Sequence, residues 1–160
     1  IFVAGKDGAW DKAEAIYDWV RDNIEYKEGK LKGALAALKD GNGDCEELTS
    51  LFVAMCRANR IPARTVWIEG HCYPEFYLQD DQGDGQWYPC QAAGTRNFGG
   101  MFDKRLIMQK GDTFKVPEMK KVQRYVAEFL SAKSVRGSGG PQVTWVRKLA
   151  LDEKPAAGFP

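Results

Sequence analysis

The chain has 160 residues, which is the usual length of about one domain. Apolar residues make up 44% and charged residues 28% of it, so the composition is globular and excludes a disordered or collagen-like chain. The 23 Lys and Arg residues balance the 22 Asp and Glu residues, which argues against nucleic acid or an anionic membrane as a partner.

The longest unbroken apolar run lies within residues 51–56 and is far shorter than the roughly 18 residues of a membrane span. We therefore expect no membrane-spanning segment. The chain begins at Ile1 without an initiator methionine and resembles an excised domain that lacks its N-terminal segment, which favours an extracytoplasmic location and neighbouring domains. We expect one domain over residues 1–153 and a linker or tail over residues 154–160.

Apolar residues at helical spacing predict helices over residues 10–25, 31–39 and 45–59. The glycines around Asn42 indicate the end of the second helix. Asp44, followed three residues later by Glu47, is typical of a capping box at the start of the third helix. This start places Cys45 in the first helical turn.

Segments rich in β-branched and aromatic residues predict strands over residues 64–69, 71–78 and 86–91, of which the last two form a hairpin around a polar turn. A period-2 pattern at Val143, Trp145 and Leu149 predicts a final strand. Residues 122–130 fit a helix or a strand, and we favour a strand. These elements indicate the α+β class.

The only histidine, His71, begins a predicted strand that follows the helix of Cys45. A helix N-terminus favours a thiolate, and a nearby imidazole can take the thiol proton and later protonate a leaving amine. The carboxylates of Asp44, Glu46 and Glu47 oppose the thiolate unless they cap backbone N–H groups. Taken alone, Cys45 is more typical of a buried structural thiol, and His71 equally of an ordinary strand residue.

Several segments resemble the motifs of the transglutaminase-like superfamily, which has a papain-like fold. The resemblance covers residues 13–92 and lies in residues 16–26, 43–45, 51–57, 61–64, 71–78 and 87–91. It implies an α+β fold in which the nucleophile helix packs on an antiparallel sheet. It also implies Cys45 as nucleophile, His71 as base, and acyl transfer at an amide through a thioester, without a cofactor or metal.

The chain departs from this family at Gln91, where the family usually has the Asp that orients the imidazole. If the hairpin sets His71 opposite Gln91, the amide oxygen could accept a hydrogen bond from the ring, as Asn does in papain-like sites. The same register would set Cys72 opposite Cys90, which permits a disulfide or two packed thiols. Residues 71 and 72 point to opposite faces of the strand and could not both bind one ion. We therefore expect no zinc site formed by Cys45, His71, Cys72 and Cys90.

Other side chains are candidates for substrate binding or for the oxyanion site beside the Cys45 N–H group. Glu75 could position a substrate, although an ion pair is the favoured interpretation, and Arg64 is expected to form structural hydrogen bonds. Core packing is the simpler role for the aromatic residues, some of which could line a cleft. The substrate-site candidates are Tyr73, Trp87 and Glu75, and the oxyanion candidates are Tyr26, Trp10 and Trp19.

We expect a cysteine hydrolase or acyltransferase with a protein or peptide substrate. Hydrolysis by a protease, amidase or deamidase is favoured over cross-linking, because an acceptor amine needs a second, water-excluding site that the sequence does not identify. One alternative is a binding or assembly module with little or no turnover. The neutral Gln91, in place of the usual Asp, is the reason to consider it. Another is an amidase similar to peptide N-glycanase that acts on glycosylated Asn.

Overall fold

The computed structural model describes residues 3, 5, 7–113, 115, 120–122, 142, 144 and 146. The chain divides into two units, Ile1–Val126 and Ala127–Pro160, and every helix and strand below belongs to the first. The strands predicted over 122–130 and 143–149 fall almost entirely outside the described residues, and the predicted tail over 154–160 falls wholly outside them.

The three predicted helices are present as α1 (Ala9–Asn23), α2 (Ala34–Asp40) and α3 (Cys45–Ala58). Helix α1 buries the apolar stripe that its spacing predicts, which consists of Ala13, Ile16, Tyr17 and Val20. Helix α2 ends at Gly41, whose φ of 70° lies in the left-handed region that glycine adopts without strain.

Helix α3 begins with the predicted capping box. The side chain of Asp44 accepts the N–H of Glu46 at 2.8 Å, and Glu47 accepts the N–H of Asp44 at 3.2 Å. A Cβ atom on Gly43 would lie 2.4 Å from the Cβ of Glu47, so this close approach requires glycine. These contacts fix where α3 begins and therefore where Cys45 lies.

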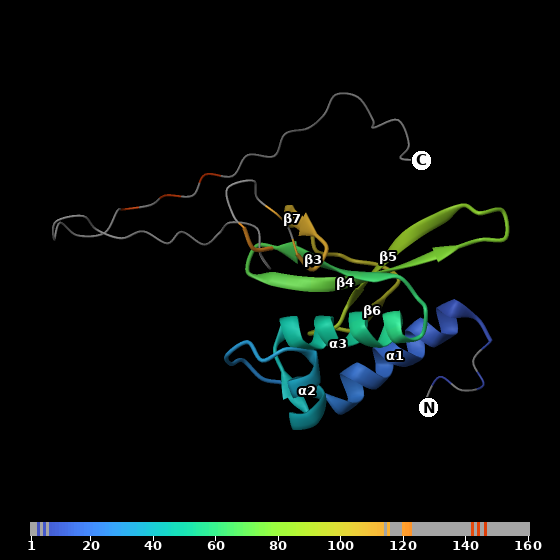
Figure 1. The fold of residues 1–160 in the computed structure, drawn as a ribbon, viewed down its shortest axis with the longest axis horizontal. Helices are drawn as coiled ribbons and strands as arrows, with labels where there is room; N and C mark the ends of the chain where they lie inside the picture. Colours follow the sequence, from blue (N-terminus) through green and yellow to red (C-terminus); the bar gives the residue numbers. More distant parts are fainter. Residues whose placement is uncertain are drawn as a thin grey trace. The chain divides into compact units, whose positions relative to one another are not determined.

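An antiparallel sheet of five strands covers one side of the helices (Figure 1). The predicted strands are β3 (Ala63–Ile68), β4 (His71–Gln79) and β5 (Gly85–Gln91). The sequence did not predict the short edge strands β6 (Asn97–Phe98) and β7 (Ile107–Lys110), nor the separate parallel pair β1 (Glu25–Tyr26) and β2 (Asn42–Gly43). Strands of two to four residues are too short to show an alternating pattern.

The expected register of the β4–β5 hairpin is wrong by two residues. Gln79 lies opposite Gly85 and Glu75 lies opposite Pro89, because the turn between the strands is closed by the Asp80 side chain and backbone. Continued along β4, this register sets Cys90 beside Pro74, whose carbonyl oxygen is 3.8 Å from the Cys90 sulfur. The pairing that would have joined Cys72 to Cys90 is therefore wrong, and both are buried free thiols.

The main core lies between the sheet and helices α1 and α3, with Tyr17, Phe52 and Phe76 fully buried in it. A smaller cluster of Val66, Ile68 and Tyr73 packs separately, with Met101 against it. Helices on one face of an antiparallel sheet confirm the predicted α+β class (Figure 1). Within the described residues, no helix has the length and apolar character needed to cross a bilayer.

Candidate active site

Cys45 is the first residue of α3 and its side chain is partly exposed. The backbone N–H groups of a helix's first turn have no partner within the helix, and they point toward the side chains at its start. The short strand β1 runs beside β2, which sets Tyr26 next to Gly43 and close to this helix start. Cys45 thus lies at an accessible helix N-terminus with an aromatic residue beside it.

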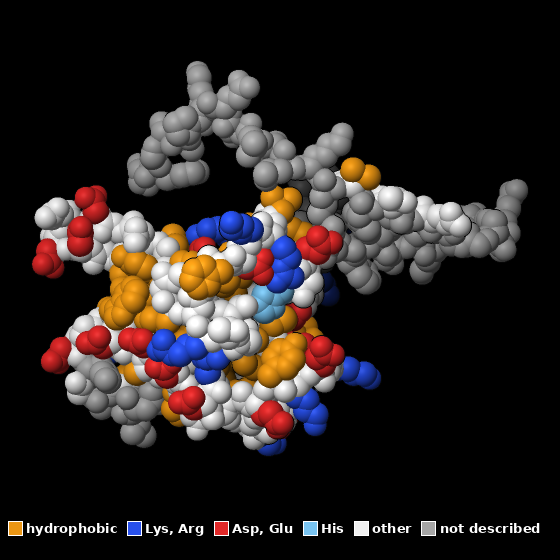
Figure 2. All heavy atoms as spheres, turned by 180° about the vertical axis from the view of Figure 1, so that it is seen from behind, with side chains coloured by type: hydrophobic (Ala, Val, Ile, Leu, Met, Phe, Trp, Pro, Cys, Tyr) orange, Lys and Arg blue, Asp and Glu red, His pale blue; other side chains and the backbone are white. Residues whose placement is uncertain are grey.

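His71 is the first residue of β4, and its ring contacts both other residues predicted to be catalytic. The Nε2 atom lies 2.9 Å from Oε1 of Gln91, and the imidazole also forms a hydrogen bond with the Cys45 side chain. Because Nε2 is engaged by Gln91, Nδ1 is the ring nitrogen available to the sulfur. Figure 2 shows the single histidine, in pale blue, reaching the molecular surface among charged and apolar side chains.

Helix α1 holds the backbone of Gln91 in place. The carbonyl oxygen of Gln91 accepts a hydrogen bond of 2.8 Å from the Tyr17 hydroxyl and one of 3.0 Å from Nη1 of Arg21. Both donors belong to α1, far away from Gln91 in the sequence. Because these bonds involve only the backbone of Gln91, its side chain is available to contact the imidazole.

Cys72, which follows His71 on β4, is a third group in contact with the Cys45 sulfur. Its S–H and its backbone N–H both form hydrogen bonds with Cys45. Thr49 lies one helical turn after Cys45, and its hydroxyl is 3.4 Å from the Cys72 carbonyl oxygen. The alternation of a strand predicts that residues 71 and 72 act on separate faces, but at the beginning of β4 both reach the same sulfur.

These contacts favour the ionised form of Cys45. The hydrogen bond from the Cys72 S–H is the largest influence that lowers the pKa of Cys45 to about 4, and the bonds from His71 and the Cys72 N–H act with it against burial. The bond with Cys45 is also the largest influence that raises the pKa of His71 above its usual value, assisted by Gln91. A thiolate and an imidazolium therefore stabilise each other.

The side chains of Asp44 and Glu47, at the start of α3, are used in capping. Glu47 is 2% exposed and accepts N–H groups of Lys32 and Gly33 at 3.0 and 3.1 Å as well as that of Asp44. Burial is the main influence that raises the pKa of Asp44 to about 6. The penalty expected from these carboxylates is smaller than the stabilisation that Cys45 receives from Cys72 and His71.

An ion pair that the sequence gave no reason to expect lies near the imidazole. Arg105 pairs with Asp103 and donates a hydrogen bond of 2.6 Å to the carbonyl oxygen of Glu69, just before β4. Arg105 lowers the pKa of Asp103 to about 2, with a smaller contribution from the positive charge of His71. The pair lies in the loop between β6 and β7, where no periodic pattern marks it.

The structure does not bring the other substrate-site candidates to the sulfur. Both oxygens of Glu75 are paired, one with Arg64 at 2.8 Å and the other with Lys110 at 2.9 Å, so the ion-pair interpretation is the one observed. Trp87 stacks against the Arg64 guanidinium at 3.8 Å and lies opposite Tyr77. That position is about 20 Å along β4 from His71.

Of the remaining aromatic candidates, three pack in apolar clusters and one lies near Cys45. Tyr73 packs in the small cluster with Val66 and Ile68, and Trp10 packs with the rings of Phe76, Tyr88 and Phe98. Trp19 packs against the main core. Tyr26 is the candidate that the structure sets near Cys45: burial and the Cys45 charge raise the pKa of its hydroxyl, and 51% of its surface is exposed.

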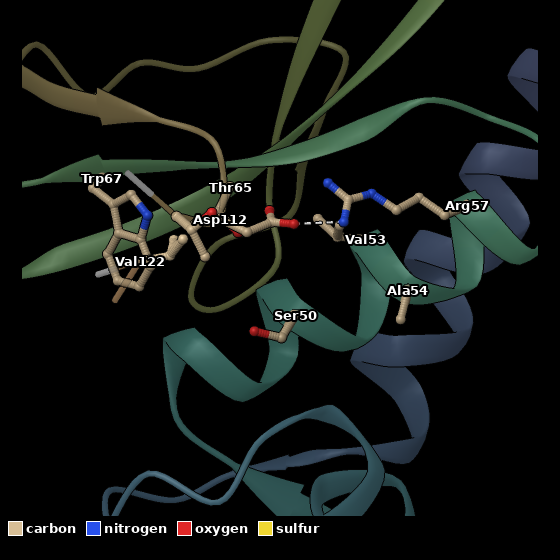
Figure 3. A pocket seen from close by; sticks show the side chains of 9 residues that line it. Ser50, Val53, Ala54, Arg57, Thr65, Trp67, Asp112 and Val122 are labelled. Carbon is tan, nitrogen blue, oxygen red and sulfur yellow. Dashed lines mark hydrogen bonds and ion pairs between the residues drawn. The ribbon is translucent and has the colours of Figure 1, made fainter. Parts of the chain in front are cut away.

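A cavity of about 310 Å³ lies on another side of α3 (Figure 3). Ser50 and Arg57 of the helix and Trp67 of β3 line it, and Arg57 bridges to Asp112 across it. Cys45, His71 and Gln91 are not among the residues that line it. Across the described part of the chain, no three His, Cys, Asp or Glu side chains are grouped to hold a metal ion.

Comparison with known proteins identifies the family of this chain. The sequence profile of the transglutaminase-like superfamily matches residues 2–92. The chain belongs to the transglutaminase-like superfamily. This match spans α1 to β5 and includes Cys45, His71 and Gln91.

The chain is also similar to a solved structure of a candidate cysteine protease from Cytophaga hutchinsonii, with 27% identity and a TM-score of 0.47. The similarity covers 57% of this chain and 34% of that protein, so this chain spans about a third of its length. The search of curated protein sequences returned no match.

Proposed function

We propose that the protein is a cysteine-dependent acyl-transfer enzyme that acts on an amide or peptide bond of a protein or peptide through a thioester on Cys45. Membership of the transglutaminase-like superfamily supports cysteine-dependent catalysis at the level of the family. The observation that carries the proposal is the chain of hydrogen bonds from the Cys45 sulfur through the His71 ring to the Gln91 amide.

In the proposed reaction the Cys45 thiolate attacks the carbonyl carbon of the substrate. The negative oxygen that forms is stabilised by the Cys45 backbone N–H at the start of α3, with Tyr26 as the candidate second donor. The His71 imidazolium gives its proton to the leaving amine, and a thioester remains. The neutral imidazole then takes a proton from the acceptor that releases the acyl group.

Water is the acceptor that we favour. His71 is only partly buried, so water can reach the thioester from the surface seen in Figure 2. A cross-linking reaction would in addition need an amine held in place of that water. The proposed activity is therefore that of a protease, amidase or deamidase.

The neutral Gln91 is compatible with turnover. Its amide oxygen accepts a hydrogen bond from the Nε2–H group and so fixes the ring with Nδ1 toward the sulfur, as a carboxylate would. A neutral partner stabilises the imidazolium less, but Cys45 supplies the counter-charge within the pair. This contact favours an enzyme over a binding module that has lost its catalytic geometry.

A survey of peptides tests the proposal and separates the reactions. The full chain is incubated with a mixture of Gln- and Asn-containing peptides and a fluorescent primary amine, and the products are identified by mass spectrometry. New peptide termini report proteolysis, conversion of Gln to Glu reports deamidation, and amine adducts report cross-linking. Cys45→Ala should abolish every product, whereas Cys90→Ser should retain them. Products that persist in Cys45→Ala, or none from the unmodified chain, would overturn the proposal.

A further inference from the structure

Cys72 places a second thiol against the candidate nucleophile, and the proposed acyl transfer gives this thiol no step of its own. Its S–H donates a hydrogen bond to the Cys45 sulfur. The bond between Thr49 and the Cys72 carbonyl, at 3.4 Å, holds β4 against the same turn of α3. A disulfide joins its two sulfurs at about 2.05 Å, so the sulfurs of this hydrogen-bonded pair must move closer to each other to form one.

The two thiols differ in access and in charge. Cys45 is partly exposed and is held as a thiolate, the form that reacts with oxidants. Cys72 is 1% exposed, and its hydrogen bond to Cys45 keeps it protonated and raises its pKa. An accessible thiolate beside a shielded second thiol is the arrangement of cysteines that oxidise reversibly.

We propose that Cys45 and Cys72 form a site of reversible oxidation, in which a hydroperoxide oxidises Cys45 and Cys72 converts the product into an intramolecular disulfide. The Cys45 thiolate attacks the O–O bond, gains one oxygen as a sulfenic acid and transfers two electrons to the peroxide, which leaves as hydroxide or alkoxide. The Cys72 sulfur then attacks the sulfenic sulfur. The S–S bond forms, the S–O bond breaks, and the Cys72 proton leaves with the hydroxide as water.

The disulfide would stop acyl transfer, because the nucleophile is consumed. It would also protect Cys45, since a sulfenic acid without a nearby thiol proceeds to irreversible sulfinic and sulfonic acids. A dithiol reductant restores both thiols. This inference rests on the proposed function only in requiring that Cys45 is a thiolate, and it does not require a substrate.

Cys90 provides the matched control. It is a fully buried free thiol on the neighbouring strand, and its sulfur contacts the Pro74 carbonyl oxygen at 3.8 Å. Cys45 is not among the charges or hydrogen-bond partners that determine its pKa. Replacing Cys90 therefore removes a buried thiol without removing the contact between Cys45 and Cys72.

The test treats the full chain with hydrogen peroxide, blocks the remaining thiols with iodoacetamide, and maps peptides without reduction. We expect a pair of peptides joined by a disulfide between Cys45 and Cys72. Dithiothreitol should separate the two peptides, after which iodoacetamide should again label Cys45. In Cys72→Ser the labelling recovered after reduction should fall about tenfold, with Cys45 found as sulfinic or sulfonic acid. Cys90→Ser should match the unmodified chain.

Three results would overturn the inference: a disulfide mapped to another pair, Cys45 that does not react with peroxide, or equal irreversible oxidation in the unmodified chain and Cys72→Ser. Mapping the unmodified chain decides the matter even if Cys72→Ser fails to fold. A joined peptide pair in a protein that turns over no peptide would uphold this site and count against the proposed enzyme. Peptide turnover without the joined peptide pair would support the proposed enzyme and count against this oxidation site.

Discussion

His71 and Gln91 are joined by a hydrogen bond of 2.9 Å between Nε2 and Oε1, although they are not opposite each other in the β4–β5 ladder. The register, continued from Glu75 and Pro89, sets Gln91 beside Tyr73, which is two residues away from His71. Diagonal neighbours in an antiparallel pair are about 7 to 8 Å apart, a gap that a long side chain can bridge. The length of the Gln91 side chain is therefore part of how this site is built.

Shortening the side chain at position 91 should cost activity even when the amide is retained. We expect Gln91→Asn to lower kcat/KM by about 10- to 100-fold, because the side chain loses one methylene group and no longer reaches Nε2. Gln91→Glu keeps the reach and adds a charge that raises the His71 pKa further, so activity should be retained or increased. Equal kcat/KM values for Gln, Asn and Glu would show that residue 91 has no part in the mechanism.

The sequence predicted the parts of the fold that depend on local patterns. The stripe of α1 and the capping box of α3 are recognisable because each depends on residues within one or two helical turns. The neighbourhood of Cys45, His71 and Gln91 was expected from the resemblance to the family. The helix features needed no knowledge of a distant contact, whereas the neighbourhood of these three residues came from the resemblance alone.

The parts that were missed depend on register or on long-range packing. The pairing of β4 with β5 is set by the turn after Gln79, and an error of two residues there was enough to suggest a disulfide that the structure does not have. The contact between Cys72 and Cys45 depends on how the end of β4 meets α3. The pair of Asp103 and Arg105 lies in an irregular loop, where sequence periodicity gives no signal.

Glu75 should matter for stability and not for the reactivity of Cys45. Its carboxylate is 6% exposed and pairs with Arg64 and Lys110, so Glu75→Gln leaves two cations with weaker partners. We expect a loss of about 2 to 3 kcal/mol in the free energy of unfolding, measured in urea. The exposed turn variant Asp81→Asn should change little. Lost turnover in Glu75→Gln with unchanged stability would instead support a role in substrate binding.

Gly43 should tolerate no side chain. A Cβ atom at this position meets the Glu47 side chain at 2.4 Å, so Gly43→Ala must displace the capping box or β2. We expect a loss of about 1 to 3 kcal/mol in the free energy of unfolding, together with a higher pH midpoint for the alkylation of Cys45. Gly29→Ala is the control, because a Cβ there meets no atom within 4 Å. Similar stability of the two variants would contradict this account of the helix start.

Tyr26 should act on turnover without acting on the thiolate. If its hydroxyl helps to stabilise the negative oxygen, Tyr26→Phe should lower kcat by about tenfold or more, while the pH dependence of Cys45 alkylation stays the same. Steady-state kinetics on a peptide identified in the survey, together with alkylation of the same variant, separates the two effects. An unchanged kcat would exclude Tyr26 as the second donor.

The pKa values also predict the pH range of turnover. Cys45 is ionised above about pH 4, and His71 stays protonated up to a pKa above its usual value, so the reactive pair exists between these limits. The dependence of kcat/KM on pH should be bell-shaped, falling below pH 4 as the thiolate is protonated and falling again as the imidazolium loses its proton. A profile that keeps rising to pH 9 would be that of an ordinary thiol.

The midpoint of the pH profile for Cys45 alkylation tests the central claim most directly. The midpoint is more informative than the rate at one pH, because a thiolate of low pKa is also a weaker nucleophile. With iodoacetamide and peptide mapping of Cys45, we predict a midpoint near pH 4 for the unmodified chain and for Cys90→Ser. His71→Ala should move it upward by about one pH unit or more. A midpoint between about 8 and 9 in the unmodified chain, identical in His71→Ala, would contradict the thiolate–imidazolium pair.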